Sequence, residues 1–231
     1  MNVRRLLAPL IVLIPLISLS ACSGGSDSVD AGKPLTGTIK FTPGSCSGGD
    51  VKGTYFRMIS PGGTVAKGGY FQNPDSPCPD KSFTTETSGT DGGLVVGSFQ
   101  PPTGKPFDVT GNSRAGRIFK PGNFTAIKFG ISTNQVDPQT KKKVAAPELS
   151  VKDGKVTGQV TAWSASWNNL YFNQGSPKPD GTRPGITTPV AGTYDSSTGA
   201  IVVTWASQIV GGPFNRFTGY WHLEGTFVPK K

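Results

Sequence analysis

Residues 190–207 read VAGTYDSSTGAIVVTWAS, in which two runs rich in β-branched and aromatic residues flank a short polar segment. Asp195 places a carboxylate where a turn begins, and Gly199 stands where the chain needs a left-handed backbone conformation. Short runs of this composition on either side of such a segment are typical of paired strands. The stretch therefore predicts a β-hairpin, with strands at residues 190–194 and 200–207.

A second segment, Asp137-Pro138-Gln139-Thr140-Lys141, repeats the spacing of this turn but ends on lysine. If it copies the first turn, Lys141 adopts a left-handed conformation that costs a residue with a Cβ roughly 1 kcal/mol. Two related turns favour a meandering antiparallel sheet. The three consecutive lysines at 141–143 are then interpreted as a solvated group at a turn.

The rest of the chain continues the same pattern of short runs and turns. It contains 32 glycines and 20 prolines, and no apolar run keeps a helical period beyond a turn or two, so long helices are not expected. Further strands are predicted at Leu35–Phe41, Val51–Ile59, Thr64–Phe71, Leu94–Phe99, Thr125–Ser132, Lys155–Ala165 and Thr218–Val228. These strands predict an all-β fold, an antiparallel β-sandwich, with an open β-barrel as the alternative.

The last predicted strand separates its side chains into two faces, because successive residues of a strand point to opposite sides. We expect the apolar set to face the core and the other set to face outward. The two sets are Trp221, Leu223 and Phe227 on one side, and Tyr220, His222 and Glu224 on the other.

The stretch Leu19-Ser20-Ala21-Cys22 ends an apolar run, residues 6–19, that follows two arginines. This run is shorter than the roughly 20 apolar residues that a spanning helix needs. An aliphatic residue at Leu19 with a cysteine three positions later resembles the lipobox of bacterial lipoproteins. The resemblance implies a signal peptide at residues 1–21, which is removed. It also implies that Cys22 becomes the lipid-bearing first residue, anchored by acyl chains such as palmitate.

The segment after Cys22 is small and polar up to Pro34, so residues 22–34 are interpreted as a flexible tether. Residues 35–231 are expected to form a single β-rich domain outside the cytoplasm, held at the cell membrane by the lipid. The net charge is +9, which in a cytoplasmic protein would suggest nucleic-acid binding. In an exported protein the polyanions within reach are lipid headgroups and acidic envelope polymers, so no nucleic-acid partner is expected.

Three cysteines are present, and Cys22 is assigned to lipid. Cys46 and Cys78 remain as a pair in an oxidising compartment, where a disulfide is expected. In the chain-entropy view this bond stabilises the fold by about 3 to 4 kcal/mol. Two reduced structural thiols are the alternative. No metal site is expected, because the single histidine lies far away in the sequence.

The segment Trp163–Gln174 is the candidate ligand-binding region. If it is extended, Trp163 and Trp167 share one face, and flat rings bordered by amides suit a carbohydrate. The alternative is that both tryptophans belong to the core, as is common in sandwiches. The candidate ligand-binding residues are Trp163, Trp167, Asn169, Tyr171, Asn173 and Asp180.

Catalytic signals are weak. His222 is the only histidine, and no serine elbow or metal-ligand spacing surrounds it. Its neighbour Glu224 shares the strand face and would orient the imidazole or raise its pKa. Carboxylates at Asp180, Asp195 and Glu224 would serve glycosidic cleavage only if the fold brings two of them together. No catalytic residue and no cofactor are assigned.

Two segments resemble each other, Tyr70–Asp80 and Tyr171–Asp180, each an aromatic pair followed by an amide and proline loop. Duplication of a strand-loop unit and convergent turn chemistry both account for the match. Separately, residues 167–181 and 209–225 are similar to segments of uncharacterised secreted bacterial proteins.

The function expected from these observations is a lipid-anchored binding or structural module of the cell envelope. Its candidate partners are the membrane, through the anchor, and an envelope glycan or acidic polymer. A glycan-modifying enzyme that uses loop carboxylates is the alternative.

Overall fold

The computed structural model describes residues 32–230, and the expected signal peptide, Cys22 and most of the expected tether lie outside them. Every regular element in this range is a β-strand, and no helix suited to crossing a membrane occurs in it. The strands are β1 (Lys33–Pro34), β2 (Gly37–Phe41), β3 (Ser45–Ser47), β4 (Asp50–Lys52), β5 (Tyr55–Thr64), β6 (Gly68–Tyr70), β7 (Thr84–Thr85), β8 (Gly93–Val96), β9 (Gly122–Phe124), β10 (Ile127–Thr133), β11 (Glu148–Lys152), β12 (Lys155–Gln159), β13 (Trp163–Trp167), β14 (Leu170–Asn173), β15 (Val190–Tyr194), β16 (Ala200–Gln208) and β17 (Thr218–Pro229).

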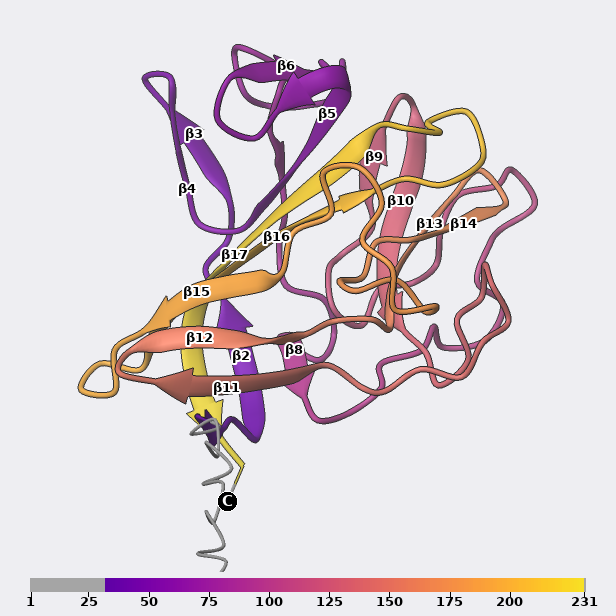
Figure 1. The fold of residues 1–231 in the computed structure, drawn as a ribbon. Coiled ribbons are helices and arrows are strands. Elements are labelled where there is room, and N and C mark those ends of the chain that lie inside the picture. Colours follow the sequence, from indigo (N-terminus) through magenta and orange to yellow (C-terminus); the bar gives the residue numbers. More distant parts are fainter. Residues whose placement is uncertain (1–31, 231) are drawn as a thin grey trace, which may run out of the picture. The chain divides into compact units, whose positions relative to one another are not determined.

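The strands form a large sheet, a smaller sheet and a separate hairpin (Figure 1). The large sheet runs β1-β11-β12-β15-β16-β17-β2-β8, with β5, β6 and β7 branching from β17. The smaller sheet runs β14-β13-β10-β9, and β3 pairs with β4. Neighbouring strands pair antiparallel wherever the register is defined in residues 32–230. The predicted all-β antiparallel fold is confirmed.

Both predicted turns are present. Gly199 has φ 75° and Lys141 has φ 61°, so lysine does occupy the left-handed position. The backbone N–H of Gly199 donates to Asp195 O at 2.8 Å, and that of Lys141 donates to Asp137 O at 2.9 Å. The same local hydrogen bond therefore closes both turns, with and without glycine.

The strand β17 changes partner along its length. Residues 218–222 pair with β5, and residues 225–229 pair with β2. At the change, Thr54 Oγ1 donates to Glu224 O at 2.9 Å and accepts from Glu224 N at 3.1 Å. Together with Thr42 N, which donates to Glu224 O at 2.8 Å, these bonds satisfy the backbone of Glu224 at the fork. The fork thereby places β5 and its loops beside the first half of β17.

The core lies where the two sheets share side chains. Trp163 of the smaller sheet packs edge-on against Trp205 and Trp221 of the large sheet, with ring centroids 5.1 and 5.4 Å apart. All three rings are at most 1% exposed. The expected core residues of β17 are buried, and its expected outward residues are partly exposed. The predicted assignment of side chains to the two faces of β17 is therefore confirmed.

The prediction of one strand over residues 155–165 is wrong. Two strands occupy this range, and they belong to different sheets, β12 to the large one and β13 to the small one. A turn separates them, in which Trp163 N donates to Val160 O at 2.9 Å. The hairpin of β11 and β12, which turns through Asp153 and Gly154 at φ 50° and 72°, was not predicted although Asp-Gly is a strong turn signal.

Candidate functional site

The predicted ligand-binding stretch is a hairpin and is not extended throughout. β13 and β14 turn through Asn168 and Asn169, which have φ 48° and 60°. In the register of this hairpin, Tyr171 lies opposite Ser166, and Asn173 lies opposite Ser164. Because paired residues share a face and neighbours alternate, the amide and tyrosine side chains are on the opposite face from the two tryptophans.

Both tryptophans of this hairpin pack inward. Trp163 is 0% exposed. Trp167 is half-buried, its Nε1 donates to Phe124 O at 2.8 Å, and its ring packs against Phe214. The two rings therefore do not form one open surface for stacking a sugar.

Two of the predicted residues, Asn173 and Asp180, line one pocket of about 290 Å³. Lys178, which was not predicted, lies between them in sequence and lines the same pocket. Asn169 and Tyr171 line a neighbouring hollow instead. The structure thus brings part of the predicted set together, around a buried lysine.

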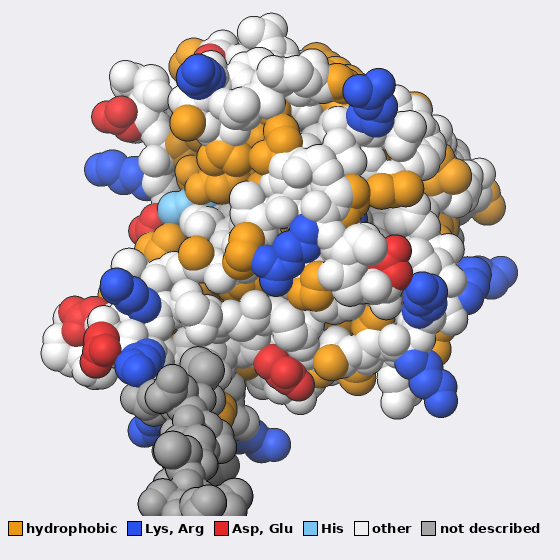
Figure 2. All heavy atoms as spheres, viewed as in Figure 1, with side chains coloured by type: hydrophobic (Ala, Val, Ile, Leu, Met, Phe, Trp, Pro, Cys, Tyr) orange, Lys and Arg blue, Asp and Glu red, His pale blue; other side chains and the backbone are white. Residues whose placement is uncertain are grey.

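A different surface, on the outward face of β5 and β17, carries a continuous run of planar side chains. The Arg57 guanidinium lies 3.2 Å from the Tyr70 ring centroid and 3.9 Å from that of Phe83. Phe83 meets Tyr55 edge-on at 5.1 Å, and Tyr55 stacks on His222 at 4.6 Å. We call this run, Tyr70, Arg57, Phe83, Tyr55 and His222, the aromatic face. Figure 2 shows hydrophobic side chains gathered beside the single histidine.

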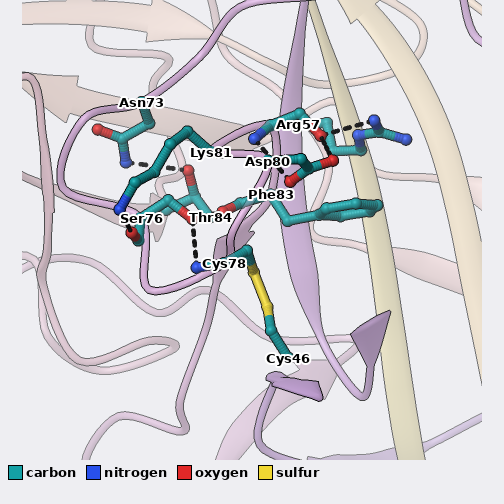
Figure 3. Close-up of a disulfide and its surroundings, with 10 residues drawn as sticks. Cys46, Arg57, Asn73, Ser76, Cys78, Asp80, Lys81, Phe83 and Thr84 are labelled. Carbon is teal, nitrogen blue, oxygen red and sulfur yellow. Dashed lines mark hydrogen bonds between the residues drawn. A yellow bond between two sulfur atoms is a disulfide. The ribbon is translucent and has the colours of Figure 1, made fainter. Parts of the chain in front are cut away.

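The loop that carries Phe83 is joined to this face through Arg57 and to β3 through a disulfide (Figure 3). Arg57 Nη2 donates to Ser82 Oγ at 2.7 Å, and Ser82 Oγ donates to Asp80 at 2.7 Å. The predicted disulfide joins Cys46 of β3 to Cys78 of this loop, with Cα atoms 5.4 Å apart. The disulfide prediction is confirmed, and the bond joins the loop to the β3–β4 hairpin.

Burial sets the electrostatics of the aromatic face. It raises the pKa of Tyr55 to about 12 and lowers the pKa of Arg57. Burial also lowers the pKa of His222, although Glu224 Oε2 at 3.6 Å acts in the opposite direction. Burial therefore favours the neutral imidazole, and Arg57 is the cation of this surface.

The carboxylates proposed for glycosidic cleavage divide between two pockets. Asp195 and Glu224 line one pocket of about 360 Å³, and Asp180 lines the pocket of Lys178. Hydrogen bonds from Ser197, its side chain first, lower the pKa of Asp195 to about 2. A glycosidase needs one carboxylic acid with a raised pKa. The carboxylate of Asp195 instead accepts hydrogen bonds within its own turn.

Sequence reasoning assigned no binding role to the aromatic face and predicted only the outward orientation of its β17 side chains. His222 and Tyr220 were expected to point outward, and both do so partly. Tyr55 reaches this surface through the pairing of β5 with β17, and Phe83 through the pairing of β7 with β5. Neither long-range contact has a local sequence signal.

The chain matches no protein family, no curated protein and no solved structure among those compared with it.

Proposed function

We propose that this protein is a lipid-anchored, extracytoplasmic binding module of the cell envelope, and that its aromatic face binds a glycan. The observation that carries the proposal is the run of stacked planar groups on an outward sheet face. Partly exposed rings offer apolar surface to the C–H groups of sugars, while Arg57 and Glu224 offer a donor and an acceptor to the hydroxyls. At the His222 end of the aromatic face lies the carboxylate of Glu224, whose Oε2 is 3.6 Å from His222 Nε2.

The proposed location is supported by the lipobox-like Leu19–Cys22 stretch and by the disulfide, a bond that persists in oxidising compartments. Two acyl chains on Cys22 hold a protein firmly at a membrane, since each buried methylene contributes about 0.8 kcal/mol. We expect the wild-type protein in the detergent phase on phase partitioning, and Cys22→Ser in the aqueous phase or as unprocessed precursor. A variant that stays in the detergent phase with unchanged mobility contradicts the anchor.

The binding proposal is tested with the purified full-length protein on a glycan array, followed by calorimetry with the glycans that bind. Tyr220→Ala removes a ring that lies 6.4 Å from Tyr55 on the same surface, and we expect it to weaken binding at least tenfold. Tyr194→Ala is the matched control, because Tyr194 lies on β15 and packs against Phe227. Equal affinity of the two variants rejects the aromatic face, and loss of binding on Tyr171→Ala moves the site to the β13–β14 hairpin.

A further inference from the structure

Lys178 is a buried cation whose hydrogen-bond partners are both neutral. The residue is 6% exposed, and its Nζ donates to the backbone oxygen of Asn173 and to Ser207 Oγ. Within residues 32–230, no carboxylate oxygen is paired with this ammonium group. An ammonium group has three hydrogens to donate, and the two neutral acceptors use two of them.

A buried charge without a counter-charge is costly, and proteins normally pair it. Here Asp137 and Asp180 attract the charge of Lys178 without forming an ion pair with it, and the residue lines a pocket that opens to solvent. A bound anion would give Nζ both a third acceptor and an opposite charge. The unpaired ammonium therefore points to an anionic ligand.

The pocket's size limits the ligand. Its volume of about 290 Å³ is at the lower end of the roughly 300–1,000 Å³ of small-molecule sites, which suits a single ring. Pro179, Pro184 and Val210 supply apolar wall, and Lys142 supplies a second cation. The lining thus combines apolar surface with positive charge.

Two carboxylates near Lys178 limit the ligand's charge. Asp137 accepts from Asn173 Nδ2 at 2.9 Å and from Thr140 Oγ1 at 2.7 Å, so it is occupied in holding the loop. Asp180 accepts from Thr182 Oγ1 at 2.7 Å and lines the pocket. Both repel a second negative charge on the ligand, which favours a carboxylate over a doubly charged phosphate.

We propose that this pocket binds the carboxylate of a monosaccharide acid, with Lys178 as its ion-pair partner and Lys142 as a second contact. The proposal does not depend on glycan binding at the aromatic face. It gives the molecule a separate acidic-sugar site, built on the loop after β14.

The test is a titration of the full-length protein with sodium glucuronate and, as the uncharged control, with glucose. We expect saturable binding of glucuronate and none of glucose. Lys178→Met keeps the side chain's length and removes its charge, and we expect it to weaken glucuronate binding at least tenfold. Absence of glucuronate binding, equal binding of glucose, or unchanged affinity in folded Lys178→Met overturns the proposal.

Two variants at the pocket mouth keep the test decisive if Lys178→Met does not fold. Asp180→Asn removes a repelling charge from an exposed residue and is expected to tighten glucuronate binding several-fold, whereas Lys142→Met is expected to weaken it several-fold. If neither variant changes the affinity, the ligand does not occupy this pocket. Tyr220→Ala is expected to leave glucuronate binding unchanged, which separates this site from the aromatic face.

Discussion

Two loops of the molecule, residues 73–82 and 173–182, are held by the same contacts although they follow different strands. The Oδ1 of Asn73 accepts the backbone N–H two residues ahead at 3.2 Å, and the Oδ1 of Asn173 does so at 3.0 Å. Each Nδ2 donates to two acceptors elsewhere in the fold. In both loops the asparagine joins its own turn to a distant part of the chain.

The agreement continues along the loops. Ser76 Oγ and Ser176 Oγ each donate to a backbone carbonyl further along the chain. Asp80 and Asp180 each accept the backbone N–H two residues ahead, at 3.1 and 3.0 Å. The polar positions that the two sequences share are thus the ones that build the loop.

The loops differ at the buried position two residues after the serine. In one loop it is Cys78, which is covalently joined to β3 through Cys46. In the other it is Lys178, which lines a pocket. The comparison teaches that asparagine, serine and aspartate form a scaffold, and that the position between them carries the distinguishing chemistry. Substitutions of the scaffold residues and of the variable position are therefore expected to have different effects.

The largest effect is expected from the covalent link. The double variant Cys46→Ala, Cys78→Ala should lose about 3 to 4 kcal/mol of unfolding free energy, because the disulfide restricts the unfolded chain. Urea unfolding measures the loss, and a reductant should destabilise the wild type but not the variant. Hydrogen exchange after reduction should rise in residues 73–82 and stay unchanged in 173–182. An unchanged unfolding midpoint contradicts this role of the bond.

The scaffold residues are expected to have the next largest effect, and a similar one in both loops. Asn73→Ala and Asn173→Ala each leave buried backbone groups without partners, so each should cost about 1–3 kcal/mol. Both asparagines are at most 2% exposed. Denaturant midpoints of the two variants, measured side by side, check the equivalence. A severe loss in one loop beside a neutral change in the other breaks the comparison.

The smallest effect concerns the charge of Lys178. Burial lowers its pKa to about 7, below the roughly 10.4 of an unfolded lysine. Between these values the unfolded chain binds more protons, so the unfolding free energy should rise with pH and the penalty should be fully present below pH 7. The rise is about 1 kcal/mol from pH 7 to pH 8.

Lys178→Met should remove that rise, and Lys142→Met, an exposed lysine of the same pocket, should retain it. Urea unfolding at the two pH values gives the comparison. Parallel pH dependence in wild type and Lys178→Met means that the buried lysine keeps an ordinary pKa.

Local signals predicted the parts of the fold that depend on local physics. The turns that begin at Asp137 and Asp195 could be predicted because the carboxylate and the residue in the left-handed conformation both lie within one five-residue segment. The pairing of Cys46 with Cys78 followed from elimination, since the third cysteine was assigned to lipid. The faces of β17 followed from alternation, because only one of them is fully buried.

The candidate site depended on contacts that no short stretch encodes. Alternation fails for β13, because both of its faces are covered and Ser164 and Ser166 are as buried as Trp163. Tyr55 meets Phe83 because β7, which directly follows Phe83, pairs with Tyr55 and Phe56 of β5. Lys178 gave no sign in the sequence that its charge is buried. These features come from tertiary packing.

The most direct test of the aromatic face uses the fact that the chain has one histidine. The imidazole of His222 therefore gives a single Cε1–H signal in the NMR spectrum, and it lies stacked on Tyr55 with ring centroids 4.6 Å apart. When a glycan that binds on the array is titrated into the full-length protein, the account predicts a saturable shift of this signal with the same affinity as calorimetry gives. Binding that saturates while the His222 signal stays in place would contradict it.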